Sequence, residues 1–204
     1  VNYLSPTEFG AVIDGFYDTG DRVFLGKTTS GGKEDLIFFN RNVSGYAIKV
    51  MEIMTGKIRC EMEHGTAPGF FDGWIDDTDK MFVEDVDGDG IVELILVNTY
   101  YGGGAISVRE LTTGFPTKFT VINHSSTSGA ANNFTGFFDA TDRVFMADID
   151  GNGGSDLVMV NTANSGNTIR AIRLETDSGQ GPGTRIFSDI AASTSFDGWL
   201  DSCD

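Results

Sequence analysis

The sequence has little of what several common classes of protein need. Its 204 residues include only 2 Cys, 2 His and 4 Pro, and Lys plus Arg total 14 against 30 for Asp plus Glu. Two cysteines are too few for a disulfide-rich scaffold or a four-Cys zinc site. A formal net charge of −16 disfavours binding to nucleic acid or to anionic lipid, because both need basic faces. No apolar run approaches the roughly 20 residues that span a bilayer, so we expect no membrane insertion.

Catalytic signatures are also missing from the sequence. It contains no nucleophile elbow, zinc signature or phosphate-binding loop, and His64 and His124 have no motif around them. The many carboxylates could supply a glycosidase pair, but most of them belong to a repeated pattern, and repeated residues rarely form one asymmetric catalytic centre. We therefore expect a protein that is not an enzyme.

What the sequence does contain is an internal repeat. Segments similar to Phe71-Asp72-Gly73-Trp74 begin at residues 13, 71, 134 and 196, at spacings of 58, 63 and 62 residues. Each repeat holds four β-rich runs separated by turns rich in glycine. The predicted strands are 22–27, 35–40, 46–53 and 57–63, then 80–86, 92–99, 105–112 and 117–123, then 143–149, 156–162, 168–175 and 184–190.

Four antiparallel strands in a tandem repeat of this length are typical of a β-propeller blade. The expected fold class is therefore all-β, with three propeller-type blades, and a β-sandwich is the alternative. The blades would cover 13–70, 71–133 and 134–195, with 1–12 resembling the tail of a preceding blade and 196–204 the opening of a following one.

Three blades are fewer than the four to eight of a typical closed propeller. We therefore expect other copies of the chain, or further blades of a longer chain, to complete the ring or stack. Repeat ends without caps expose apolar faces and strand edges, which favours association. A head-to-tail contact that does not close would give a filament.

Two acidic loops join the first and second predicted strands of the second and third repeats. Each has side-chain oxygens at loop positions one, three, five and nine, Gly at position six, and a backbone carbonyl available at position seven. Ca²⁺ takes six to eight oxygen ligands, and glycine permits the tight turn that gathers them. An EF-hand would need Glu at position twelve, where these loops have Leu96 and Met159.

The loops therefore predict two Ca²⁺ sites per chain, and a solvated Asp/Gly turn without metal is the alternative. The predicted ligands are Asp85, Asp87, Asp89, Ile91, Glu93, Asp148, Asp150, Asn152, Gly154 and Asp156. The corresponding first loop begins at Lys27 and keeps only one of these acids, Asp35. We expect no metal there, and we expect the Lys27 ammonium to take the place of the cation and pair with Asp35.

Through these loops and the strands around them, the sequence resembles the FG-GAP/VCBS repeat family of integrin α-subunit propellers and bacterial secreted proteins. The residues that carry the resemblance are Asp85 to Leu94 and Asp148 to Leu157. It implies propeller blades whose loops bind Ca²⁺ through the acids named above. Millimolar extracellular calcium suits sites of modest affinity, and with the acidic surface this favours a location outside the cell, secreted or at the cell surface.

The function expected from these features is extracellular and depends on calcium. It is adhesion, or the binding of glycans or extracellular proteins. One alternative is a structural subunit of an extracellular oligomer or filament built by joining incomplete propellers. A second alternative is a fragment of a polysaccharide-active enzyme, because some propellers of this family class belong to polysaccharide lyases.

Other residues leave open questions. Cys60 is either a buried free thiol or the partner of Cys203 in a disulfide. Aligned aromatic residues predict packing between blades; they are Phe16, Trp74, Phe137 and Trp199. Glycosylation sequons, which matter only in a eukaryotic secretory pathway, begin at Asn42, Asn123 and Asn133.

Overall fold

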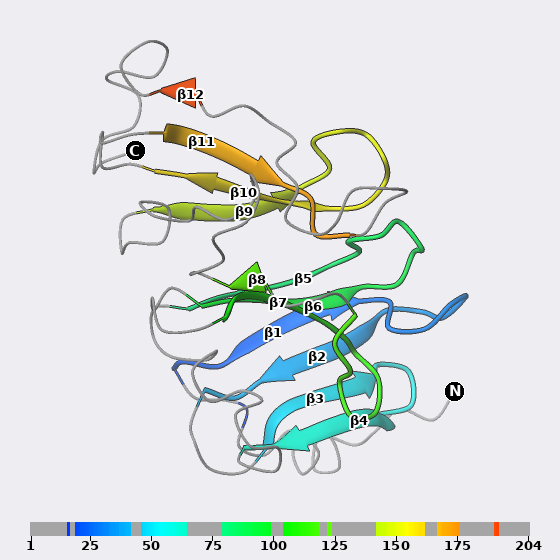
Figure 1. Cartoon of the computed structure of the whole chain (residues 1–204). Helices are drawn as coiled ribbons and strands as arrows, with labels where there is room; N and C mark the ends of the chain where they lie inside the picture. Colours follow the sequence, from blue (N-terminus) through cyan, green and yellow to red (C-terminus); the bar gives the residue numbers. More distant parts are fainter. Residues whose placement is uncertain are drawn as a thin grey trace.

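The chain folds into three antiparallel sheets stacked in sequence order (Figure 1). The computed structural model describes residues 16, 19–41, 46–64, 79–98, 104–118, 122–123, 142–161, 167–175 and 190–191. In these ranges it contains strands, turns and irregular segments but no helix, and hence no helix long and apolar enough to cross a membrane.

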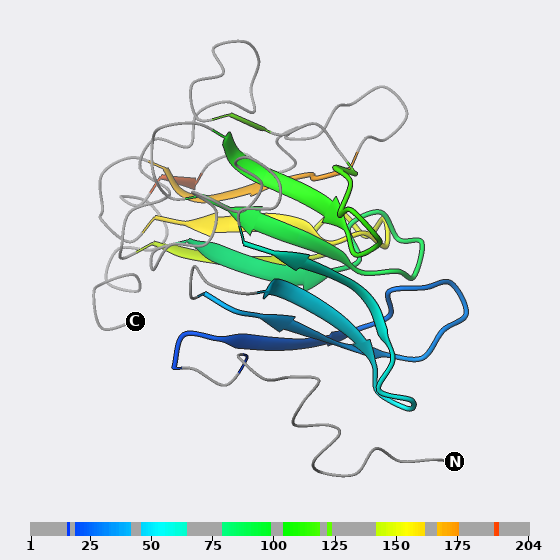
Figure 2. The same ribbon diagram turned by 90° about the horizontal axis from the view of Figure 1, so that it is seen from below.

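Each sheet consists of four strands that follow one another along the chain. The first contains β1 (Arg22–Gly26), β2 (Asp35–Phe39), β3 (Tyr46–Glu52) and β4 (Ile58–Glu63). The second contains β5 (Lys80–Glu84), β6 (Glu93–Val97), β7 (Gly104–Glu110) and β8 (Ile122–Asn123). The third contains β9 (Arg143–Ala147), β10 (Asp156–Val160), β11 (Asn167–Ile172) and β12 (Ile190–Ala191). Seen from below, the three sheets overlap with their strands running in similar directions (Figure 2).

These sheets confirm the predicted fold class, all-β with propeller-type blades of four antiparallel strands. The fourth strands differ most from the prediction. The described part of the predicted strand 117–123 comprises an isolated pair between Thr117 and Arg109 and the short β8, and 119–121 lie outside the described residues. Just before it, Phe115 has a φ of 43° and a fully buried side chain between the first two sheets. Most of the predicted strand 184–190 lies outside the described residues.

Alternation along the strands gives every sheet two apolar faces. We call the face toward the preceding repeat the leading face and the other the trailing face. The trailing face of the first sheet and the leading face of the second share one core; its members include Ile37, Phe39, Ile48, Val50, Met81, Val83, Leu94 and Leu96. The trailing face of the second sheet and the leading face of the third share another; its members include Ile95, Val97, Ile106, Val108, Leu157, Met159 and Ile172. Because burying one such side chain contributes about 1.5–3 kcal/mol, these two cores hold the sheets together.

A repeated backbone contact also joins neighbouring sheets. The Val92 N–H donates to the Lys27 carbonyl at 2.8 Å, and the Ser155 N–H donates to the Asp85 carbonyl at the same distance. Lys27 and Asp85 both occupy loop position one, and Val92 and Ser155 both occupy position eight, so the two contacts are equivalent. The loops after β1, β5 and β9 therefore lie along one side of the molecule (Figure 1).

The leading face of the first sheet is partly covered by Phe16. This ring is buried and lies 5.8 Å from that of Phe38, in a small cluster with Met51. Phe16 thus packs on the first sheet, and no contact with a second sheet tests the predicted packing between blades; Trp74, Phe137 and Trp199 lie outside the described residues.

Candidate metal centre

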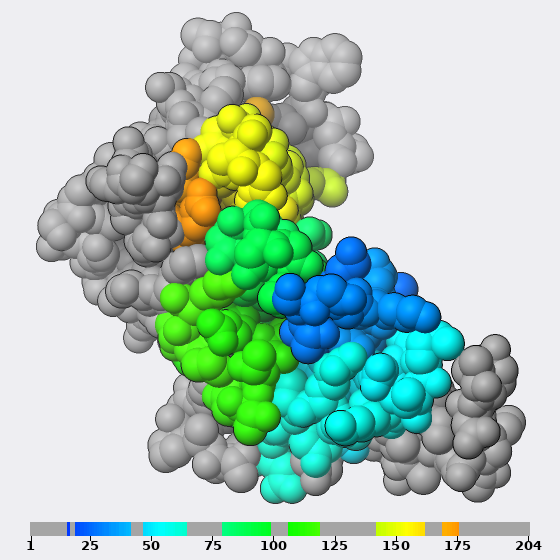
Figure 3. Space-filling view, turned by 90° about the vertical axis from the view of Figure 1, so that its right-hand side faces the viewer, coloured from blue at the N-terminus to red at the C-terminus, as the bar shows by residue number. Residues whose placement is uncertain are grey.

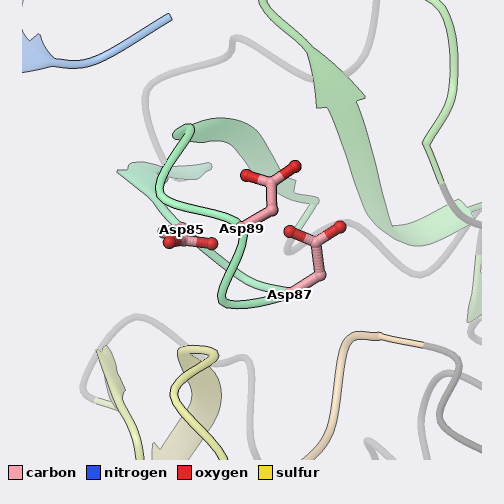
Figure 4. A group of neighbouring side chains, drawn as sticks. All are labelled: Asp85, Asp87 and Asp89. Carbon is pink, nitrogen blue, oxygen red and sulfur yellow. The ribbon is translucent and has the colours of Figure 1, made fainter. Parts of the chain in front are cut away.

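Three carboxylates of the second loop converge between β5 and β6. One oxygen each from Asp85, Asp87 and Asp89 lies within 4.8 Å of the others, and Figure 4 shows all three side chains projecting from the same turn. Ca²⁺ ligand oxygens lie at about 2.3–2.6 Å from the ion, so oxygens this close together can share one cation. The structure thus places these predicted ligands together.

Backbone hydrogen bonds set the shape of this loop. The Gly88 N–H donates to Asp85 Oδ1 and the Gly90 N–H donates to Asp85 Oδ2, both at 2.7 Å. Both glycines have positive φ, 74° for Gly88 and 82° for Gly90, a region that other residues rarely adopt. The Ile91 N–H donates to Asp89 Oδ1 at 2.8 Å. Gly90, at position six, therefore permits the tight turn that the sequence predicted for it.

The third loop, between β9 and β10, repeats the pattern. Asp148 accepts N–H bonds from Gly151 at 2.7 Å and Gly153 at 3.1 Å, and these glycines have φ values of 76° and 95°. One oxygen each from Asp148, Asp150 and Asp156 lies within 4.8 Å of the others. The structure thus also brings these predicted ligands together, on the same kind of turn.

Asn152 and Gly154, the other two predicted ligands of the third loop, bond to each other. Asn152 Oδ1 accepts the Gly154 N–H at 2.7 Å, and its amide nitrogen donates to Glu175 at 2.6 Å. Gly154 is tightly packed, because a Cβ there would lie 2.4 Å from the Val86 carbonyl oxygen of the second loop. The second and third loops are thus in direct contact.

The acid at position nine is buried and held from position two in both loops. Glu93 accepts the Val86 N–H at 3.1 Å, and Asp156 accepts the Ile149 N–H at 3.0 Å. Burial raises the pKa of Glu93 to about 7 and that of Asp156 to about 6, although these N–H bonds act in the opposite direction. A buried acid that remains charged needs a cation beside it. Both loops therefore favour a bound cation next to the acid at position nine.

In the second loop, a basic side chain provides such a cation. Lys118 Nζ lies 2.7 Å from Glu93 Oε1, 2.8 Å from Asp87 Oδ2 and 3.5 Å from Asp89 Oδ2. Burial by itself would lower the pKa of Lys118, but its hydrogen bonds to Asp87 and Glu93 outweigh that effect and raise it. The ammonium therefore stays charged within the acidic cluster.

The donor set of the second loop fits a hard divalent cation in spite of Lys118. Three carboxylates contact one ammonium and a fourth, that of Asp85, belongs to the same cluster, which leaves excess negative charge. Asp87 Oδ1 is buried and has no hydrogen-bond partner. Each carboxylate oxygen that accepts one N–H keeps a second lone pair. Oxygen ligands of this kind are those that Ca²⁺ takes in proteins.

The third loop has its own basic residue at the end of β11. Arg173 Nη2 pairs with Asp150 Oδ2, and Arg173 Nε lies 3.9 Å from Glu175. This guanidinium neutralises part of the charge at Asp150. Asp148 and Asp156 remain as further acids of the same cluster.

The prediction for the first loop was wrong about the cation. Lys27 is exposed, and Asp35 pairs instead with Arg59 of β4, whose Nε lies 2.9 Å from Asp35 Oδ2. The Thr28 hydroxyl donates to the same oxygen at 2.5 Å. Asp35 is fully buried at the start of β2, so an exposed side chain cannot pair with it. Arg59 lies on β4, on the other side of β3, and its side chain reaches Asp35 across that strand.

Sequence reasoning missed Arg59, Lys118 and Arg173. Arg59 and Lys118 lie 59 positions apart, close to the 58-residue spacing of the first two repeats, and each reaches the position-nine acid of its own repeat. A search for basic residues that recur near the fourth strands would have found this pair. Arg173 directly follows the third strand of its sheet, not the fourth, so no such signal exists for it.

A pocket of about 280 Å³ opens between the first two sheets. Threonine hydroxyls, two basic side chains and Leu111 surround it; the lining residues are Thr28, Thr29, Lys57, Arg59, Cys60, Leu111, Thr112 and Thr113. Ligand pockets combine an apolar wall with a few polar groups that fix orientation. Hydroxyl and cationic groups beside one apolar side chain suit a small, hydroxyl-rich ligand.

Cys60 is a free thiol in the structure. Its sulfur donates to the Leu111 carbonyl at 3.3 Å, and burial raises its pKa to about 12. The buried-thiol alternative therefore describes Cys60, whereas Cys203 lies outside the described residues.

Comparison with known proteins gives likenesses to solved structures. No protein-family model matches the chain, and no curated protein matches it significantly. A solved structure of a lectin from Agrocybe aegerita, described as recognising non-reducing terminal N-acetylglucosamine, is similar with a TM-score of 0.53 and 20% sequence identity. The similarity covers 88% of this chain and 40% of the lectin chain. At this identity the likeness concerns the fold.

Proposed function

We propose that the chain is a calcium-binding recognition module of FG-GAP/VCBS type that binds glycans outside the cell, for example in adhesion. The observation that carries the calcium part is the pair of loops in which backbone N–H groups gather three carboxylates around one point. The second loop would hold Ca²⁺ through Asp85, Asp87, Asp89, Glu93 and the Ile91 carbonyl. The third would use Asp148, Asp150, Asn152, Asp156 and the Gly154 carbonyl.

Calcium in this proposal stabilises the folded protein. An ion that binds only the folded state adds about 2.7 kcal/mol per site at 100 times Kd. For a chain of this length, that corresponds to a rise in Tm of about 5–10 °C per site. Empty loops would concentrate carboxylates that repel each other.

Thermal unfolding in CaCl₂, in MgCl₂ and in EDTA tests the calcium part. We expect Tm to rise with Ca²⁺ and much less with Mg²⁺, because Mg²⁺ rarely uses all-protein cages. Asp87→Asn and Asp150→Asn should each remove part of the rise, whereas Glu61→Gln, a change of an exposed acid on β4, should not. Equal curves in CaCl₂ and EDTA, or equal shifts with both ions, would contradict the proposal.

The glycan part is supported by the lectin fold likeness and by the pocket between the first two sheets. Its volume is near the lower end for ligand sites, which suits one terminal sugar residue. N-acetylglucosamine is the first sugar to test, because the structurally similar lectin is described as recognising it.

Calorimetric or NMR titration with N-acetylglucosamine and with other monosaccharides, in CaCl₂, tests the glycan part. We expect weak but saturable binding that is reduced at least several-fold by the double change Thr112→Val and Thr113→Val. Thr19→Val, at an exposed position outside the pocket, is the matched control. No binding on a broad glycan array would contradict a role in glycan recognition.

A structural role in an assembly is the second candidate function. The observation that favours it is the exposure of large apolar side chains on the first and third sheets and in the third loop, namely Val23, Leu25, Phe145 and Ile149.

A further inference from the structure

The leading face of the first sheet exposes residues that the same face of the second sheet buries. Met81 and Val83 on β5 are 5% and 8% exposed, because they pack against the first sheet. Their counterparts on β1, Val23 and Leu25, are 53% and 56% exposed. Large apolar side chains that are exposed together mark an interaction surface.

The trailing face of the third sheet has a matching open region. Val86, at position two of the second loop, is fully buried against the third sheet, whereas its counterpart Ile149 in the third loop is 44% exposed. Phe82 on β5 packs against the same core, whereas its counterpart Phe145 on β9 is 45% exposed. Within the described residues, each outer face thus lacks what the inner faces have, a neighbouring sheet.

Both open regions include the first strand of a sheet. Within the chain, β1 contacts β5 and β5 contacts β9, and Figure 3 shows the first, second and third repeats following one another in that order. The next contact of this kind would join β9 to β1 of another copy. In the repeated backbone contact, the Glu34 N–H of that copy, at position eight, would then donate to the Asp148 carbonyl of the first copy, at position one.

Charge also favours this contact. Position seven of the third loop, Gly154, lies against the Val86 carbonyl at position two of the second loop. A similar arrangement would place Lys33, at position seven of the first loop, near Ile149, with the two loops slightly farther apart because Gly154 leaves no room for a Cβ. Lys33 is exposed, and so is Asp148 next to Ile149. The Lys33 ammonium would therefore meet the acidic third loop, which steers association and disfavours wrong pairings.

We propose that copies of this chain associate head to tail, with the trailing face of the third sheet in one copy packed on the leading face of the first sheet in the next. The occupant of each outer face is a second copy of the chain, and the contact repeats the two that already exist between sheets. Such a heterologous contact gives a ring if it closes and a filament if it does not. This inference rests on the second candidate function, a structural role in an assembly, and is independent of glycan binding.

Sedimentation velocity of the 204-residue chain over a range of concentrations, in CaCl₂ and in EDTA, tests the proposal. We expect the wild-type mass to rise well above that of one chain as concentration increases. Leu25→Glu should block the leading face and Phe145→Glu the trailing face, so each variant alone should be monomeric. Both side chains are about half exposed, so the changes should leave the fold of one chain intact, as circular dichroism can check.

A mixture of the two variants distinguishes this contact from a symmetric one. Each variant keeps one working face, so an equimolar mixture should form a heterodimer and nothing larger. Ile53→Glu, at an exposed position in the turn between β3 and β4, should assemble like the wild type. A wild-type chain that stays monomeric at about 100 µM would overturn the proposal. Assembly of either single variant alone would also overturn it, and so would the absence of a heterodimer in the mixture.

Discussion

Replacing Lys118 with Met should tighten Ca²⁺ binding at the second loop by at least about tenfold. In the structure, the Lys118 ammonium lies 2.8 Å from Asp87 Oδ2 and 2.7 Å from Glu93 Oε1, two of the proposed ligands. A metal ion that binds these oxygens must compete with the ammonium. Met keeps the length and apolar stem of the side chain but removes the charge.

The size of the effect follows from the contacts that Ca²⁺ has to replace. A hydrogen bond that involves a charged group contributes about 1.5–3 kcal/mol, and the side chain of Lys118 is only 15% exposed, so solvent screens the pair incompletely. The loss of one such bond, about 1.5 kcal/mol, already corresponds to about a tenfold change in Kd. Without metal, the variant should be less stable than the wild type, because its acids lose their counter-charge.

Calorimetric titration with CaCl₂ in an Asp148→Asn background, which weakens the third loop, would isolate the second site. Lys80→Met, at a half-buried lysine on the same sheet, is the matched control and should leave Kd unchanged. An unchanged or weaker affinity in the Lys118→Met variant would refute the reasoning. It would mean that Lys118 stays at the site beside the metal and does not compete with it.

Three other predictions follow from single residues. Gly90→Ala should weaken Ca²⁺ binding and lower the free energy of unfolding by about 1 kcal/mol or more, because Gly90 has a φ of 82°. Calorimetry would measure the binding, and equilibrium urea unfolding would measure the stability. Arg59→Met should lower the free energy of unfolding by about 1–3 kcal/mol, because it leaves the buried Asp35 carboxylate without its ion pair. An unchanged midpoint of urea unfolding would contradict this prediction. Cys60 should react with a thiol reagent at pH 8 only after unfolding, because a pKa raised to about 12 keeps the buried thiol protonated far above that pH; rapid labelling of the folded chain at Cys60, located by mass spectrometry, would show that the thiol is accessible.

The sequence predicted the first three strands of every repeat to within a few residues. The second strand of every repeat begins at an acid that the repeat places at the same position, and apolar alternation indicates the other strands. The fourth strand of the second repeat could not be predicted in this way. Phe115 looks like a strand residue, but the gap between the first two sheets buries its side chain and bends the chain. That burial depends on a neighbouring sheet.

The acidic loops could be predicted because their ligands and glycines lie close together in the sequence. The basic partners could not, because each comes from a segment far from its loop in the sequence. Arg59 reaches Asp35 across β3 at an irregular step in the pairing of β3 with β4, and the sequence does not encode that step visibly. Lys27 was the nearest cation in the sequence, but its backbone carbonyl is bonded to Val92 and its side chain is exposed.

The three loops share one physical problem, a buried acid at position nine. Asp35, Glu93 and Asp156 are 0%, 1% and 2% exposed, and each accepts a hydrogen bond from position two of its loop. Burying a charged carboxylate costs free energy unless a cation compensates it, so the start of the second strand creates a demand for positive charge in every repeat. In the first loop, the single guanidinium of Arg59 meets that demand.

The second and third loops carry more negative charge than their basic residues balance. In the second loop, Lys118 faces Asp87, Asp89 and Glu93, and Asp85 lies in the same cluster. One ammonium therefore opposes four carboxylates, whereas a bound divalent ion would add two positive charges among oxygens that the backbone already holds in place. The first loop lacks these extra acids, so a metal would gain little there. The difference between the loops is thus one of charge balance around the same buried acid.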